Sequence, residues 1–119
     1  MKVISLIRTR DGSRVLLMLV LFALVGIGRA SDVWAKPKVH TVVIEAMKFS
    51  PEVTEVSAGD SVVWINKDPF PHNVVADNRA FHSREIATNS RWKMKATRKG
   101  SIAYVCTLHP TMKGTLVVK

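Results

Sequence analysis

The sequence is sparing in the residues that usually hold a small protein together. Its 119 residues include one cysteine, Cys106, so no disulfide can form within the chain. No stretch shows a sustained helical period and no segment repeats, which argues against a helical bundle and against a solenoid. A small chain without disulfides needs another source of stability, and a bound metal ion is a common one.

Long apolar runs are also scarce, and the one that exists lies near the N-terminus. Val15 to Gly28 is apolar, follows several basic residues and precedes small residues around Ala30 and Ala35. This order predicts a secretory signal peptide over residues 1–35, cleaved after Ala35 or, as second choice, after Ala30. Because the run is shorter than the about 18 to 20 residues that cross a bilayer, no membrane anchor is expected after cleavage. The exported domain is then 36–119, with the periplasm as its expected location.

Acidic residues are half as numerous as basic ones, 9 against 18. From Lys36 onward the chain carries 13 Lys and Arg against 7 Asp and Glu, a net charge of +6 with histidine neutral. No aromatic-basic motif of a nucleic-acid-binding module accompanies this charge, so nucleic acid is not an expected partner. The field of a basic surface instead favours an acidic protein partner. For any single lysine or arginine, a merely solvated position is the default interpretation.

Residues of alternating polarity dominate the chain after the signal segment, which predicts an all-β sandwich or barrel of about seven to eight short strands. In the last predicted strand but one, Ile102, Tyr104 and Cys106 share the inward face. The stretch 76–90 predicts no more than a loop or a short strand anchored by Phe81 and Ile86. The clearest strand patterns cover residues 40–45, 61–66, 91–97, 101–106 and 114–118.

The residue types around the cysteine point to a soft metal. Cys106, His109 and Met112 follow a C-x2-H-x2-M spacing on a loop between two predicted strands. Thiolate and thioether favour copper(I), and imidazole suits both copper oxidation states. His72, in "FPHNV" just beyond a predicted strand, is the candidate for the fourth ligand. Two imidazoles and a thiolate with a distant methionine form the blue-copper arrangement, which predicts one copper ion and one-electron transfer.

Four segments in order resemble the small cupredoxins, closest in the ligand loop to amicyanin and near it to plastocyanin and pseudoazurin. They are "FSP" at 49–51, "AGDSVVWIN" at 58–66, "PHNV" at 71–74 and "YVCTLHPTMKG" at 104–114. The resemblance spans residues 39–119 and implies a Greek-key β-sandwich forming a cupredoxin-like copper-binding domain over residues 36–119.

Residue by residue, the resemblance makes His72, Cys106 and His109 the equatorial copper ligands and Met112 the axial ligand. It also implies that Asn73 joins the two ligand loops by a hydrogen bond, near the residue that follows the cysteine. The chain departs from amicyanin-like loops at two positions, since Leu108 replaces a proline and Thr111 replaces a large apolar residue.

The function implied is that of a soluble, monomeric electron carrier rather than an enzyme. Its expected partners are acidic redox proteins such as a cytochrome c or a periplasmic dehydrogenase. Electrons are expected to pass at the edge of His109, through an apolar patch formed by Phe70, Pro71, Leu108 and Pro110. The resemblance leaves the particular donor and acceptor open.

Several alternatives stay open beside this interpretation. The copper could serve delivery or storage, Cys106 could be a catalytic nucleophile with His109 as its base, or the site could hold structural zinc. A lone cysteine is also often only a small buried apolar residue. By the same reasoning Met47, Met94, Trp64 and Trp92 are expected in the core, and His40 and His82 are expected to be strand or surface histidines.

Overall fold

The computed structural model describes residues 34–119. The predicted signal peptide therefore lies almost wholly outside the described residues, and its cleavage position stays a prediction. Residues 34–38 have no regular structure, and Trp34 is exposed. Within the described part of the chain, no helix is long and apolar enough to cross a membrane.

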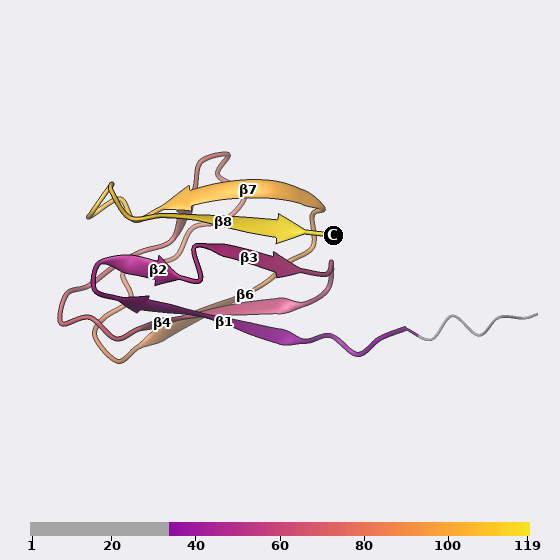
Figure 1. The fold of residues 1–119 in the computed structure, drawn as a ribbon, viewed down its shortest axis with the longest axis horizontal. Coiled ribbons are helices and arrows are strands. Elements are labelled where there is room, and N and C mark those ends of the chain that lie inside the picture. The colour runs from indigo at the N-terminus through magenta and orange to yellow at the C-terminus, as the bar shows by residue number, and fades with distance from the viewer. Residues whose placement is uncertain (1–33) are drawn as a thin grey trace, which may run out of the picture. The chain divides into compact units, whose positions relative to one another are not determined.

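Eight strands form two four-stranded sheets, which confirms the predicted all-β sandwich (Figure 1). One sheet has the strand order β2-β1-β4-β6 and the other has the order β3-β8-β7-β5. The strands are β1 (Val39–Glu45), β2 (Lys48–Ser50), β3 (Val53–Val56), β4 (Ser61–Asn66), β5 (Val75–Ala76), β6 (Arg91–Lys95), β7 (Gly100–Val105) and β8 (Lys113–Val118).

Alternation of side chains places the core between the two sheets. In the first sheet, Trp64 on β4 lies opposite Trp92 on β6, and both rings point inward with centroids 5.2 Å apart. From the second sheet, Tyr104 on β7 meets Trp64 edge-on at 5.7 Å. Edge-to-face packing of this kind is favourable beyond the area it buries. The large aromatic rings thus lock the two layers together.

The sequence pattern located the long strands well and missed the short ones. The predicted strand 61–66 coincides with β4, and the other four predicted strands overlap β1, β6, β7 and β8. β2, β3 and β5 have 3, 4 and 2 residues, which is too short to display a period. The stretch 76–90 is mostly loop, in which Phe81 and Ile86 are buried as expected.

One prediction about the core needs correction. Met47 is 37% exposed because it lies in the tight turn between β1 and β2, where its backbone φ is 60°. Trp92 and Met94 pack against the core as predicted and are half-buried, because β6 is an edge strand with a neighbour on one side alone. Trp64, on the central strand β4, is fully buried as predicted.

Gly114 lets the last two strands pack closely. A Cβ atom at this position would collide with the ring of Tyr104, which lies directly over the glycine. The two residues face each other across the β7–β8 pairing. Because Tyr104 stands two residues before Cys106, this close approach fixes the end of β7 from which the cysteine emerges.

The β7–β8 connection lies at one end of the sandwich, and the start of β1 and the C-terminus lie at the other (Figure 1). At that second end Asp60 joins three segments. Its carboxylate accepts hydrogen bonds from the backbone N–H of Lys38 at 2.9 Å and of Ser57 at 3.1 Å, and lies 2.8 Å from Nε2 of His40. The N–H of Lys38, the His40 ring and the N–H of Ser57 together lower the pKa of Asp60 to about 2. His40 is thus a strand histidine with a structural partner, as expected.

We expect Asp60→Asn to destabilise the fold most at neutral pH. A carboxyl whose pKa is lower when folded stabilises the protein above its unfolded pKa, near 3.8, and this contribution disappears as the pH falls toward 2. The difference between the urea unfolding midpoints of wild type and variant should therefore shrink between pH 7 and pH 3. Asp77→Asn, at an exposed position, is the matched control. A difference that is constant over this range would contradict the prediction.

Candidate metal centre

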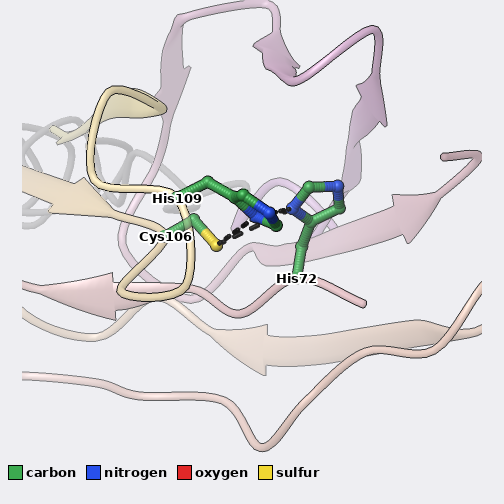
Figure 2. A group of neighbouring side chains, drawn as sticks. All are labelled: His72, Cys106 and His109. Carbon is green, nitrogen blue, oxygen red and sulfur yellow. Dashed lines mark hydrogen bonds between the residues drawn. The ribbon is translucent and has the colours of Figure 1, made fainter. Parts of the chain in front are cut away.

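Three side chains meet at the end of the sandwich that carries the β7–β8 connection (Figure 2). Sγ of Cys106 lies 3.7 Å from Nδ1 of His72 and 3.9 Å from Nδ1 of His109, and the two Nδ1 atoms are 3.2 Å apart. Cys106 follows β7, His109 lies in the β7–β8 loop, and His72 comes from the loop between β4 and β5. The site is thus assembled from both sheets.

Backbone hydrogen bonds fold the β7–β8 loop into a compact turn around its side chains. The N–H of His109 donates to the carbonyl of Cys106 at 3.2 Å, and the N–H of Met112 donates to the carbonyl of His109 at 2.9 Å. The N–H of Cys106 in turn donates to the carbonyl of Met112 at 3.1 Å. Met112 is 2% exposed, so its side chain is held inside the protein beside the cysteine.

Asp68 fixes the orientation of His72. Nε2 of His72 donates to Oδ2 of Asp68 at 2.8 Å, which fixes the ring with Nδ1 facing Cys106. The same carboxylate accepts the backbone N–H groups of Ala46 at 2.7 Å and Met47 at 3.0 Å. Burial alone would raise the pKa of Asp68, but the N–H of Met47, the His72 ring and the N–H of Ala46 hold it below its ordinary value.

Asn66 supports this arrangement from the end of β4. Its side-chain amide donates to the carbonyls of Phe70 at 2.7 Å and Ile86 at 2.8 Å, and its Oδ1 accepts the N–H of Asp68 at 2.9 Å. Ile86 and His72 also exchange two backbone hydrogen bonds, of 2.7 and 3.2 Å. The loop that carries His72 is therefore fixed by polar contacts on both sides.

Asn73 joins the two loops as the resemblance implies. Its Nδ2 donates to Oγ1 of Thr107 at 2.7 Å, and its Oδ1 accepts the N–H of Thr107 at 2.8 Å. Its backbone N–H also points at Sγ of Cys106, 3.4 Å away. This contact holds the sulfur in place between the two loops.

The donor set fits a copper ion. Two donors bound at about 2.0 to 2.3 Å to one ion, at angles between roughly 100 and 120°, lie about 3 to 4 Å apart, and the three separations fall in that range. Among residues 34–119, His72, Cys106 and His109 form a group of donors within 4.8 Å of one another. A thiolate and two imidazoles beside a buried methionine are typical of a type 1 copper site.

One edge of the centre reaches the surface. His109 is half-buried, whereas His72 and Cys106 are fully buried. Around His109 the predicted patch residues are all exposed, with Phe70 at 54% and Leu108 at 43%. The protein thus presents one imidazole at an apolar surface and shields the other donors.

The sequence predicted the side chains that face one another and, through the resemblance, Asn73, but not the residues that hold His72. His72, Cys106 and His109 are brought together, Met112 is buried next to the cysteine, and His40 and His82 lie elsewhere. Asp68 and Asn66 were missed. An aspartate four residues before a histidine is common in loops, so no signal short of the fold identifies it as the partner of the imidazole.

The sandwich and its donor set define the class as a cupredoxin with a type 1 copper site. The sequence matches the cupredoxin-like domain family over residues 15–118, and the chain belongs to this family. Amicyanin from Paracoccus versutus is 36% identical over 96 residues, which cover 76% of this chain and 70% of that protein. Plastocyanin from Scenedesmus fuscus is 32% identical over 87 residues, covering 62% of this chain and 89% of the relative.

Solved structures give the same result. The Cu(I) form of an amicyanin mutant superimposes with a TM-score of 0.64 at 31% identity, over 68% of this chain and 82% of the other. The predicted copper cofactor is confirmed by this kinship together with the donor geometry. The amicyanin and plastocyanin relatives also bear out the expectation of a non-enzymatic protein.

Asp68→Asn should weaken copper binding and raise the reduction potential. The amide keeps the shape of the carboxylate but removes a negative charge that favours Cu(II), and it can present an N–H to the histidine. Loss of the partner that orients a metal-binding histidine costs about 10- to 100-fold in metal affinity. Competition with a copper chelator and redox titration measure the two effects, with Asp77→Asn as the control. Unchanged affinity and potential in Asp68→Asn would show that the hydrogen bond does not orient His72.

Proposed function

We propose that the protein is a soluble periplasmic electron carrier with one copper ion bound by His72, Cys106, His109 and Met112. The observation that carries the proposal is the convergence of a buried thiol and two imidazole Nδ1 atoms within 3.9 Å. The copper ion, when bound, supplies a Cu(I)/Cu(II) couple. His72, Cys106 and His109 would hold the ion through two imidazoles and a thiolate, and Met112 would add its thioether.

The polar contacts of the site suit electron transfer because they fix its donors. His72 is held by Asp68, and Cys106 by the N–H of Asn73. The Asn73–Thr107 pair keeps the two loops at a constant separation. Side chains that are already in place have little to rearrange when one electron is gained or lost. The burial of His72 and Cys106 argues against rapid release of the metal, and so against a delivery role.

The exposed edge of His109 is the proposed point of electron exchange. The residues beside the two histidines in the chain, Phe70, Pro71, Leu108 and Pro110, are apolar and exposed, and we propose that they form the patch around it. A small apolar interface favours brief docking, which suits a carrier that must leave its partner quickly. The net charge of +6 from Lys36 onward favours acidic redox partners, such as a cytochrome c or a periplasmic dehydrogenase.

The signal-like N-terminus supports the periplasmic location. We also propose that the mature protein is monomeric.

The copper-loaded mature protein should show the intense visible absorption of a blue copper centre. Cys106→Ser should abolish this band, because a hydroxyl cannot replace the thiolate, while the all-β circular dichroism spectrum is retained. Thr107→Ser, next to the cysteine, is the control and should stay blue. A wild-type protein that binds copper without the band, or that loses Cu(I) to a competing chelator within seconds, would refute the electron-carrier assignment.

Met112→Leu should leave a blue copper protein with a shifted reduction potential. The substitution conserves volume in a buried position and removes only the thioether. Met94→Leu, in β6 and away from the site, is the matched control and should leave the potential unchanged. Visible spectra and redox titration of both variants measure the effect. Tight zinc binding that responds to neither substitution would favour a structural zinc site instead.

A further inference from the structure

A surface cleft of about 470 Å³ lies beside the metal centre, between the loop after β5 and the start of β6. The residues that give it chemical character are Arg84, Glu85, Ile86, Arg91 and Trp92. We call it the Arg84–Trp92 cleft. None of these residues contributes a donor to the metal centre, and the function proposed above assigns the cleft no role.

The wall of the cleft is tied to a copper ligand. Ile86, which lines it, exchanges two backbone hydrogen bonds with His72, and its carbonyl also accepts the side-chain amide of Asn66 at 2.8 Å. A molecule bound in the cleft can therefore contact Ile86, whose backbone is hydrogen-bonded to that of His72. This places the cleft next to the copper-bearing end of the sandwich.

The cleft also has a rigid aromatic side. Trp92 is half-buried, and its indole packs against Trp64 at 5.2 Å and Phe81 at 6.3 Å between ring centroids. A ring fixed from behind and open in front loses little conformational freedom on binding. Tryptophan and arginine are among the residue types most enriched where proteins bind one another strongly.

Positive charge extends from the cleft along the neighbouring strand. Trp92 and Met94 lie opposite inward-facing residues of β4, so Arg91, Lys93 and Lys95 point outward from β6, and all three are exposed. Residues 91 to 95 span about 13 Å of an edge strand at about 3.3 Å per residue. With Arg84 they form a cationic surface on which Glu85 is the acidic residue lining the cleft.

These cations have no internal role in the described part of the chain. Between residues 34 and 119, none of the ion pairs involves Arg84, Arg91, Lys93 or Lys95. Three of the seven acidic residues from Lys36 onward are engaged elsewhere, since Asp60 and Asp68 are buried in hydrogen bonds and Glu55 pairs with Lys119. The positive field of this flank is therefore available to a partner.

We propose that the Arg84–Trp92 cleft and the outward row of β6 dock an acidic redox protein, whose carboxylates bind Arg84 and Arg91 beside the copper end. The inference rests on the proposed electron-carrier function and adds a place and a chemistry for the partner. Arginine binds carboxylates through paired hydrogen bonds, and complementary charge speeds encounter and sets orientation. A cationic row that continues well beyond the cleft matches an extended acidic surface better than one small anion.

The test compares a double variant of the Arg84–Trp92 cleft with a second double variant, which removes the same amount of charge near the start of β1. Arg84→Gln with Arg91→Gln neutralises the cleft, and Lys36→Gln with Lys38→Gln is the control near the start of β1. Stopped-flow spectroscopy follows oxidation of the reduced copper protein by an acidic c-type cytochrome and by a basic one, at low and high ionic strength.

With the acidic cytochrome, we expect the second-order rate constant at low ionic strength to fall by about 10-fold or more in the cleft variant and by less than about 3-fold in the control. The basic cytochrome should react no more slowly with the cleft variant than with wild type. In the wild-type protein labelled with ¹⁵N, the acidic cytochrome should shift the resonances of Ile86 and the Trp92 indole N–H.

A reaction with a small inorganic complex distinguishes failure of the docking proposal from failure of the electron-carrier function. Reduced hexaammineruthenium donates one electron without protein docking, so all three copper proteins should accept it alike. Failure of the wild-type protein to accept that electron would overturn the electron-carrier function and the docking surface together.

Normal reaction with the small complex, combined with equal losses in the cleft variant and the control, would overturn the docking surface alone. Binding to phosphatidylglycerol vesicles that depends on Arg84 and Arg91, with no preference between the cytochromes, would also overturn it and assign the flank to a membrane surface.

Discussion

The hydrogen bond between Nε2 of His72 and the buried carboxylate of Asp68 is the contact on which the site depends. It sets the tautomer of the histidine and turns Nδ1 toward Cys106. The carboxylate is itself fixed by two backbone N–H groups of the β1–β2 turn and, through its own N–H, by Asn66. A buried charge is tolerated only when it is fully hydrogen-bonded, so the turn, the end of β4 and the ligand loop must all be in place together.

The same dependence on distant segments explains why the centre is assembled from two sheets. One sheet supplies His72 through the loop after β4, and the other supplies Cys106 at the end of β7. Aromatic packing between Trp64 and Tyr104 holds the layers at a set distance, and the paired hydrogen bonds of Asn73 and Thr107 join the loops at the surface. The spacing of the donors is thus a property of the protein fold, and the apolar rim leaves the edge of His109 in contact with solvent.

Much of this could be predicted from the sequence because the informative residues are local. The C-x2-H-x2-M spacing lies within one loop, and the dense β-branched and aromatic residues of 61–66 mark a central strand. Asp68 and Asn66 could not be predicted, since their roles arise from contacts with carbonyls and N–H groups brought from distant segments. Met47 was misplaced for a related reason: a methionine after a strand gives no sign that the chain turns there with a positive φ. The Arg84–Trp92 cleft likewise exists only once β6 and the loop before it are folded.

The parallel pairing of β3 with β8 bears on how the domain folds. Val53 to Val56 find their partners only at Thr115 to Val118, at the very end of the sequence. Contacts of such long range form late, because the loop that they close is large. His72 lies in the loop between β4 and β5 and Cys106 follows β7, so segments from both sheets must be paired before the donors can converge. The complete donor set is therefore a property of the folded domain, and a partly folded chain offers a metal ion only isolated ligands.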